Sequence, residues 1–151
     1  MKFIYSYLLL TFFLISCSAS AQIKDITPAH DEFLIVSKQV GETRNINVWT
    51  PPNYKTNRDS LPVMYMADGG IVEEDFPHIA NTLAALIESK SIPPMILVGI
   101  ANTQRRRDLT GPTAVANDKE IAPGVGGSEK FRAFIKEELF VEIKNKYRIT
   151  N

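Results

Sequence analysis

The chain has 151 residues, of which 44% are hydrophobic, 9% aromatic and 23% charged, a composition typical of globular proteins and not of disordered ones. Seventeen Lys and Arg residues balance seventeen Asp and Glu residues, so the chain lacks the general positive charge that nucleic-acid binding needs. The single cysteine excludes a disulfide framework and a cysteine-rich zinc site. The length allows no more than one domain.

The N-terminus predicts an export signal over residues 1–21. Lys2 precedes an apolar run at residues 7–15, which is shorter than the about 20 residues that cross a bilayer and typical of a signal peptide. Two cleavage sites overlap: residues 14–17 resemble a lipobox ending at Cys17, which would carry the lipid, and residues 19–21 fit an ordinary cut after Ala21. We therefore expect an exported bacterial protein, located in the periplasm or anchored by lipid in the outer membrane.

The mature chain begins with an expected antiparallel hairpin. The segments 31–40 and 44–50 are rich in β-forming residues and are separated by a short turn. In the second segment Ile46 and Val48 alternate with polar residues and with Trp49, which we expect to be half-exposed. Two prolines at 51–52 end this strand, because proline cannot donate to the ladder.

Alternating strands and helices follow and predict an α/β fold. The apolar runs 61–67 and 95–101 suit parallel strands buried on both faces, and the amphipathic pattern of 73–90 predicts a helix with acidic residues in its first turn. Residues 102–127 are predicted to form a long polar loop, a kind of loop that is usually functional or disordered. A final helix is expected over 128–147, capped by Ser128. Its inward side chains are expected to be Phe131, Phe134, Ile135, Leu139, Ile143 and Tyr147; the chain then leads toward a further strand.

The most informative candidate site is Asp68-Gly69-Gly70, at the carboxyl end of the strand 61–67. Ligands of open α/β sheets bind outside these carboxyl ends, and glycine lets backbone N–H groups approach a ligand closely. Such a turn could supply an oxyanion-hole donor. A tight turn without a functional role explains the same three residues.

The other polar candidates give no metal, cofactor or nucleic-acid site. The arginine run 105–107 lacks interleaved aromatic residues and a surrounding basic stripe, so we expect an ion pair between an arginine and Asp108 that holds the loop, with the other arginines facing solvent or an anionic ligand. His30 and His78 have no partner at metal-ligand spacing. Ser128 lacks the final glycine of G-x-S-x-G and is interpreted as a helix cap rather than a nucleophile.

Taken in order, these motifs resemble the putative-esterase family of α/β hydrolases, which includes siderophore trilactone esterases, feruloyl esterases and S-formylglutathione hydrolases. The resemblance is carried by the segments 50–54, 61–70, 92–100, 107–110 and 126–131. It implies the N-terminal part of an α/β-hydrolase fold, an antiparallel hairpin followed by β-α-β-α, in residues 22–151. It also implies hydrolysis of a small-molecule ester through an acyl-serine intermediate, without a cofactor.

Individual roles transfer from the family only where residues match. By resemblance, Gly70 would donate the oxyanion-hole N–H, and Asp68, Gly69, Arg107 and Asp108 would line the substrate site. The family's nucleophile lies in G-x-S-x-G on the next strand, followed by the acid and the histidine. This sequence contains no G-x-S-x-G. The triad is therefore expected to be absent, and the chain alone is predicted to be inactive.

Two interpretations of the whole chain remain open. In the first, it is the N-terminal fragment of an exported serine carboxylic-ester hydrolase, ending before the nucleophile strand. The strand 61–67 would then have an exposed edge, which invites pairing with another chain or self-association. In the alternative, it is a non-catalytic, lipid-anchored envelope protein derived from a degenerate esterase, which binds a ligand or partner.

Overall fold

A computed structural model describes residues 26–72, 75–121 and 124–150. The expected signal peptide, with Cys17, lies outside the described residues. Within them, four strands form one mixed sheet in the order β1-β2-β4-β3. The elements in chain order are β1 (Asp31–Val36), β2 (Thr43–Trp49), β3 (Val63–Ala67), α2 (Phe76–Glu88), β4 (Ile96–Ile100), α3 (Arg105–Leu109), α4 (Ala116–Ile121), α5 (Ser128–Phe134), the π-helical turn η2 (Ile135–Leu139) and α6 (Phe140–Lys146). The predicted α/β fold is confirmed.

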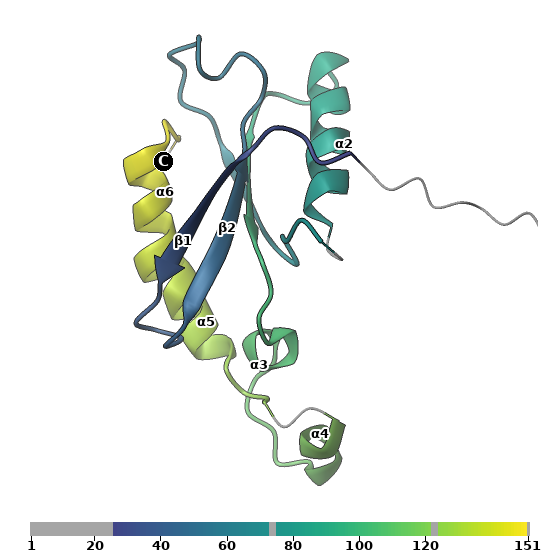
Figure 1. Ribbon diagram of the computed structural model, residues 1–151, viewed down its shortest axis with the longest axis vertical. Coiled ribbons are helices and arrows are strands. Elements are labelled where there is room, and N and C mark those ends of the chain that lie inside the picture. The colour runs from purple at the N-terminus through teal and green to yellow at the C-terminus, as the bar shows by residue number, and fades with distance from the viewer. Residues whose placement is uncertain (1–25, 73–74, 122–123, 151) are drawn as a thin grey trace, which may run out of the picture.

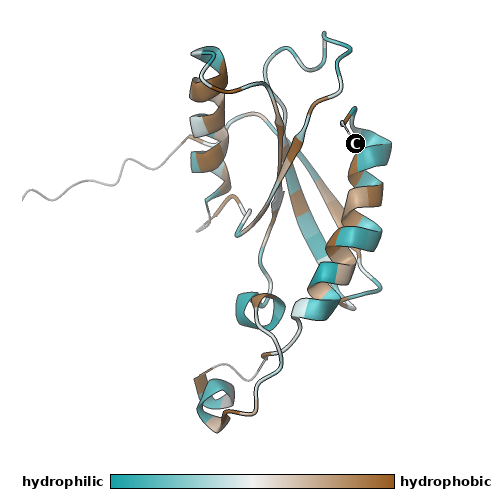
Figure 2. Ribbon diagram, turned by 180° about the vertical axis from the view of Figure 1, so that it is seen from behind, coloured by the Kyte–Doolittle hydropathy of each residue, from teal (hydrophilic) through white to brown (hydrophobic). Residues whose placement is uncertain are grey.

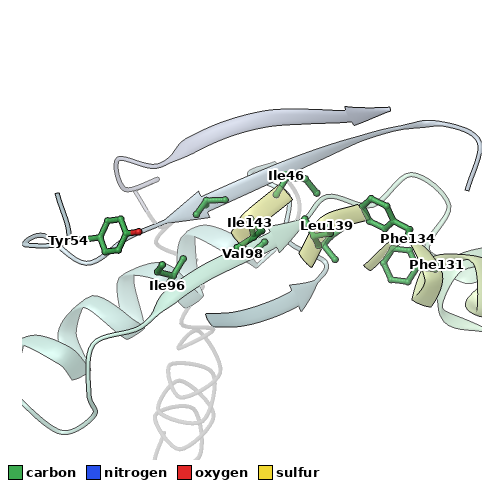
Figure 3. Packing of buried hydrophobic residues seen from close by; sticks show 10 residues of the cluster. Ile46, Tyr54, Ile96, Val98, Phe131, Phe134, Leu139 and Ile143 are labelled. Atoms are coloured by element: carbon green, nitrogen blue, oxygen red, sulfur yellow. The ribbon is translucent and has the colours of Figure 1, made fainter. Parts of the chain in front are cut away.

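Helices cover both faces of this sheet. The helix formed by α5, η2 and α6 packs on one face, and α2 packs on the other (Figure 1). Apolar and polar residues alternate along both of these helices (Figure 2), as amphipathic helices require. Each helix therefore has its own buried cluster against the sheet, and Figure 3 shows the cluster beneath α5 and α6.

The expected hairpin is confirmed, with two corrections: β1 ends at Val36 instead of continuing to residue 40, and the burial of β2 differs from its prediction. β1 and β2 pair antiparallel from Asp31 opposite Val48 to Val36 opposite Thr43. However, β2 is an inner strand whose side chains pack on both faces of the sheet, Ile46 and Val48 in one cluster and Trp49 in the other. Trp49 is only 4% exposed, and the expectation that it is half-exposed was wrong. The alternating pattern suggested one solvent face, but an inner strand of a covered sheet has none.

The parallel strand pair is also confirmed, although its two members differ in burial. β3 and β4 pair in parallel, with Val63 opposite Ile96 and Ala67 opposite Ile100. Every residue of β4 is buried, as predicted. β3 is an edge strand in which Met64 is 41% exposed, so the prediction of burial on both faces was wrong for β3.

The chain after α6 returns to the open edge of β3. Ile149 forms a parallel bridge with Leu61, and the N–H of Thr150 donates to the carbonyl of Leu61 at 2.9 Å. Arg148 anchors this segment, because its guanidinium donates to the carbonyls of Tyr54 at 2.5 Å and Asn57 at 2.8 Å. The expected lead toward a further strand is thus present, and it runs parallel to β3.

The helix predicted over 73–90 begins later than its sequence pattern indicates. α2 starts at Phe76, and its first turn contains no acidic residue, contrary to our expectation. Pro77 explains this start, since proline is favoured in the first turn, where its missing N–H costs nothing. Residues 73–74 lie outside the described part of the chain.

The predicted last helix is present from Ser128 to Lys146, and its six predicted inward side chains all pack into the core cluster. Five of them repeat every four residues: Phe131, Ile135, Leu139, Ile143 and Tyr147. In an α-helix each four-residue step advances about 40° around the axis, so the row would drift away from the sheet. The wider π-helical turn η2 winds more slowly and brings the row back.

Two details of residues 102–128 correct the sequence analysis. The predicted loop contains two short helices, α3 and α4, and Figure 1 shows α4 lying beyond α3, away from the sheet. Gly127 occupies the N-cap position of α5 and Ser128 is its first helical residue, so Ser128 is not the cap. Its backbone N–H instead donates to the carbonyl of Thr110 at 3.1 Å.

Candidate functional site

Three segments that are distant in sequence meet at the carboxyl ends of β3 and β4. The first is the turn at 68–70, which follows β3, and the second is the segment 101–110, which follows β4 and contains α3. The third is the β1–β2 turn at 37–42, which reaches this edge because β2 runs antiparallel to β4. The chain thereby brings the predicted turn and the predicted arginine run to one edge of the sheet.

The turn after β3 is fixed by close backbone packing. A Cβ on Gly69 would lie 2.3 Å from the Cα of Gly99, so only glycine fits there. The N–H of Gly69 donates to the carbonyl of Ile100 at 3.0 Å, and its carbonyl accepts from the side chain of Asn47 at 2.7 Å. Gly70 follows as a buried residue. Gly69, the residue before Gly70, therefore contacts both β4 and β2.

The carboxylate of Asp68 is held by the segment that follows β4. Arg105 donates to it through Nε at 2.7 Å and Nη2 at 3.0 Å, and Asn102 donates through Nδ2 at 2.5 Å. These contacts, chiefly the hydrogen bonds from Arg105, hold the pKa of Asp68 below its ordinary value. The Arg105 side chain is 61% exposed, so this ion pair lies at the surface.

A second and deeper ion cluster lies behind this turn. Arg44 Nη2 is 2.5 Å from Asp108 Oδ2, and Arg107 Nε is 2.8 Å from Asp108 Oδ1. Arg44 is completely buried and Asp108 is 2% exposed. The guanidinium of Arg44 also lies over the rings of Phe131 and Phe134, at 5.3 and 5.9 Å from their centroids. The expected ion pair between an arginine and Asp108 is confirmed.

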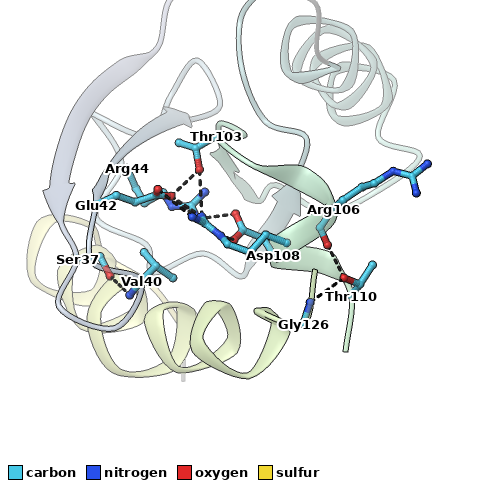
Figure 4. A network of polar contacts seen from close by, with 10 residues as sticks. Ser37, Val40, Glu42, Arg44, Thr103, Arg106, Asp108, Thr110 and Gly126 are labelled. Carbon is cyan, nitrogen blue, oxygen red and sulfur yellow. Dashed lines mark hydrogen bonds and ion pairs between the residues drawn. The ribbon is translucent and has the colours of Figure 1, made fainter. Parts of the chain in front are cut away.

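Glu42 completes the cluster on the side nearer to solvent. It accepts hydrogen bonds from Arg107 at 2.7 and 3.1 Å and from the hydroxyl of Thr103 at 2.5 Å, and it forms an ion pair with Arg44 at 2.8 Å (Figure 4). These contacts, led by the hydrogen bonds from Arg107, lower the pKa of Glu42 to about 2, and burial opposes them. Two arginines therefore face two carboxylates, and the group, here named the Arg44 cluster, is neutral.

The segment between Thr110 and Gly126, which contains α4 and is here named the α4 excursion, begins and ends beside the Arg44 cluster. The N–H of Gly127 donates to the carbonyl of Arg107 at 2.7 Å, and the N–H of Gly126 donates to the hydroxyl of Thr110 at 3.2 Å. A Cβ on Gly127 would lie 2.8 Å from Cγ of Arg107. Thr110 and Gly126, on either side of this segment, are thus held together next to Arg107.

The sequence missed Glu42 and Arg44 as members of the site. The position of Arg44 could have been predicted, because side chains two residues apart in a strand point to the same face. Arg44 therefore points to the same side as Ile46 and Val48, toward the core. Glu42 had none, since a polar residue in a hairpin turn is ordinarily solvated. For Asp68, Gly69, Gly70, Arg107 and Asp108, the structure gives the positions described above, and their roles toward a substrate stay predictions.

The remaining candidates have ordinary surroundings. His30 packs edge-on against Phe76 with ring centroids 5.5 Å apart, and His78 is exposed on α2. In the described ranges, His, Cys, Asp and Glu side chains form no group of three that could hold a metal ion. No helix between residues 26 and 150 that the structure describes has the length and apolar character to cross a membrane.

A cavity of about 470 Å³ lies at the opposite edge of the sheet. Its lining includes Pro51 after β2, Leu61 before β3 and Pro94 before β4, together with Ile87 of α2. These positions mark the amino-terminal ends of the parallel strands. The cavity is therefore separated from the Asp68 turn by the length of the sheet.

The fold matches that of known hydrolases. Among solved structures, an IroE-like serine hydrolase from Shewanella oneidensis superposes with a TM-score of 0.71 at 32% identity, covering 80% of this chain and 40% of that one. The BES protein of Bacillus cereus has a TM-score of 0.65 at 24% identity, with coverages of 82% and 51%. Enterobactin esterase FES of Shigella flexneri, with a TM-score of 0.59 at 16% identity and coverages of 85% and 29%, supports the fold alone. The protein is thus an α/β hydrolase in fold.

The sequence comparisons define the family. The family model described as "Putative esterase" matches residues 37–151, and the chain belongs to that family. Ferri-bacillibactin esterase BesA of Bacillus subtilis (strain 168) is 31% identical over 134 residues, which cover 81% of this chain and 46% of BesA. The chain therefore spans about half the length of the curated relative that it matches.

Proposed function

We propose that this chain supplies the N-terminal half of the catalytic domain of an exported serine ester hydrolase. In this proposal the half contributes the oxyanion-hole N–H of Gly70, and the serine, acid and histidine come from sequence that follows residue 151. The substrate is a small-molecule ester. The names of the relatives make siderophore esters the first substrates to test.

The observation that carries the proposal is the fixed turn at the carboxyl end of β3. The carbonyl of Ile100 and the side-chain amide of Asn47 bond to the backbone of Gly69, so the next peptide has a defined position before any substrate arrives. An oxyanion donor stabilises developing charge only when it is preorganised in this way. The parallel bridge between Ile149 and Leu61 further supports it, because a strand that continued this pairing would run beside β3 toward the same turn.

The substrate-side roles of the other predicted residues follow from their contacts. The charged groups of Arg107 and Asp108 bond within the Arg44 cluster, so we propose that they shape the site by holding α3. The carboxylate of Asp68 accepts hydrogen bonds from Arg105 and Asn102, so we propose that Asp68 helps to hold the adjacent Gly69-Gly70 turn in place.

The proposal is tested with the complete natural polypeptide that carries these residues. We expect turnover of p-nitrophenyl acetate and of a siderophore ester above a heat-killed control, and labelling of one serine by a fluorophosphonate. The variant Ser128→Ala is the matched control and should retain full activity. Residues 1–151 alone should give no turnover. Absence of both turnover and labelling in the complete polypeptide would favour the non-catalytic binding protein.

The genomic sequence offers a second test of the same proposal. A serine in G-x-S-x-G should be encoded within about 10 residues of Asn151, given the length of an ordinary strand. A stop codon followed by unrelated sequence in every frame contradicts the proposal.

Export, the lipid anchor and self-association are further parts of the proposal. Palmitate labelling that globomycin abolishes would support the anchor at Cys17, whereas a mature protein that starts at Gln22 without label would contradict it. The open edge of β3 supports association of residues 22–151 with a second chain when nothing else covers this edge. Light scattering should then show a mass that increases with concentration, and a constant monomer mass would contradict it.

A further inference from the structure

Asp68 has a backbone conformation that few residues other than glycine adopt. Its φ is +55°, in the left-handed region, where a Cβ is disfavoured for steric reasons and which Asp enters more readily than most other residues with a Cβ. Such strain persists only where the surrounding structure enforces it, and it often marks a functional site. Asp68 directly precedes Gly69-Gly70, so the cause of its conformation also determines the direction of the turn.

Residues from three segments of the chain hold Asp68 in this conformation. Arg105 of α3 holds the carboxylate with two hydrogen bonds, and Asn102 after β4 donates a third. The carbonyl of Asp68 accepts from the N–H of Asp75, just before α2, at 3.2 Å. Both the carboxylate and the backbone carbonyl of Asp68 are therefore hydrogen-bonded. The carboxylate links the end of β3 to the segment after β4.

We infer that Asp68, Asn102 and Arg105 form a clamp that positions the Gly69-Gly70 turn for catalysis. The inference rests on the proposed function and assigns positioning residues to that same site. Asp68 acts through the backbone of the turn, and its carboxylate is directed at Arg105 and Asn102. Arg105 supplies both charge and a planar fork, a combination that lysine does not reproduce.

The neighbouring arginines make the inference specific to Arg105. Arg107, two residues later, bonds to Glu42 and Asp108 within the Arg44 cluster. Figure 4 shows the guanidinium of Arg106 directed away from that cluster. The three consecutive arginines thus differ in their surroundings, and Arg106→Gln is a matched control for Arg105→Gln on the same short helix.

The clamp can be tested on the full 151-residue chain by selective labelling. With glycine labelled at 13C′ and 15N, only glycines that follow a glycine give a carbonyl-correlated amide signal, and these are Gly70 and Gly127. The Gly127 N–H bonds to the carbonyl of Arg107, so it reports on folding of the Arg44 cluster in the same sample. The measured quantity is the backbone order parameter of each amide.

We expect the Gly70 amide to be rigid in the wild type, with an order parameter near 0.85, and to fall below about 0.6 in Arg105→Gln and in Asp68→Asn. Arg105→Lys should restore only part of the order, and Arg106→Gln should leave it unchanged. Gly127 should stay rigid in all four variants. A Gly70 amide that stays rigid in Asp68→Asn, or loses order only together with Gly127, overturns the clamp.

Activity of the complete natural polypeptide separates the clamp from the proposed function. If both hold, Asp68→Asn should lower kcat about 10-fold or more with little change in KM, because a misdirected donor loses transition-state stabilisation. Equal kcat values, or a change in KM alone, would overturn the role in catalysis. If the wild type hydrolyses no ester while Gly70 still depends on Asp68, the proposed function fails and the clamp remains a structural property of the turn.

Discussion

Two ion-paired groups lie at the same edge of the sheet, and they differ most in their contact with water. In the Arg44 cluster, Arg44 is completely buried and Asp108 is 2% exposed. In the Asp68 clamp, the Arg105 side chain is 61% exposed. Both use arginine and carboxylate at similar distances, so distance alone does not distinguish their contributions. A buried charge that loses its partner is costly, whereas an exposed pair contributes little to stability.

The comparison indicates a division of roles. The Arg44 cluster joins β2, α3 and the base of the α4 excursion, and it should determine whether this edge folds. The Asp68 clamp is directed at one turn, and it should determine how that turn is oriented. The following predictions test this division, starting with the largest expected effect.

Removing the buried carboxylate should cause the largest loss of stability. Asp108→Ala leaves the buried guanidinium of Arg44 with Glu42 as its remaining ion-pair partner, and we expect the free energy of unfolding to fall by about 3 kcal/mol or more. Denaturant titration monitored by circular dichroism measures this change. The control Asp118→Ala on α4 should cost less than about 1 kcal/mol.

A double replacement sharpens this prediction. Arg44→Met combined with Asp108→Leu removes both buried charges and keeps apolar volume beside Phe131 and Phe134. We expect it to be more stable than Asp108→Ala alone, because no unpaired charge remains. A double variant that is less stable than the single one would mean that the loss arises from packing rather than from an unpaired charge.

Replacing Gly127, which contacts Arg107 of the Arg44 cluster, should cause the second-largest loss of stability. In Gly127→Ala the new Cβ would lie 2.8 Å from Cγ and 2.9 Å from the carbonyl oxygen of Arg107. The side chain or the backbone of Arg107 must then shift, which should cost about 1–3 kcal/mol. Gly111→Ala is the matched control, since nothing lies within 4 Å of a Cβ there. Equal stabilities of the two variants would contradict the close contact.

The pH dependence of the free energy of unfolding should reveal the contribution of the Glu42 carboxylate to stability. Its pKa is lowered from 4.5 to about 2 in the folded protein, first by the hydrogen bonds from Arg107. A depressed carboxyl pKa stabilises the fold above the unfolded-state pKa, so this contribution should be lost as the pH falls from about 4.5 toward 2. Glu42→Gln should flatten the stability curve in this window, whereas Glu129→Gln, an exposed residue on α5, should not. Parallel curves for wild type and Glu42→Gln would contradict the assignment.

The sequence predicted the elements of the fold more successfully than their exposure. The apolar runs at 61–67 and 95–101 correctly gave a parallel pair, and the spacing from Phe131 to Tyr147 gave the inner face of the last helix. Exposure depends on which strand lies at an edge and which lies inside, and this order is a long-range property. For that reason Trp49 and Met64 were both assigned the wrong environment.

The candidate site was predictable in its backbone and only partly in its side chains. Asp68-Gly69-Gly70 stood out because a turn at the end of an apolar strand has a known use in α/β folds. The arginine run suggested an ion pair with Asp108, yet its members look alike in sequence. Only the packing of α3 assigns Arg105 to the turn and Arg107 to the buried cluster. Short helices of this kind lack a periodic pattern long enough to reveal such a division.

The smallest effect on stability is expected from Arg105, which makes it the sharpest test of the comparison. Arg105→Ala removes an exposed ion pair, so the melting temperature should stay within about 3 °C of the wild type. The order of the Gly70 amide should nevertheless decrease, because the clamp acts on the turn and not on the core. Asp108→Ala should show the opposite balance, a large loss of stability shared by the Gly70 and Gly127 amides. If Arg105→Ala destabilises the fold as much as Asp108→Ala does, the exposed pair supports the fold directly, and the two groups at this edge form one cooperative unit.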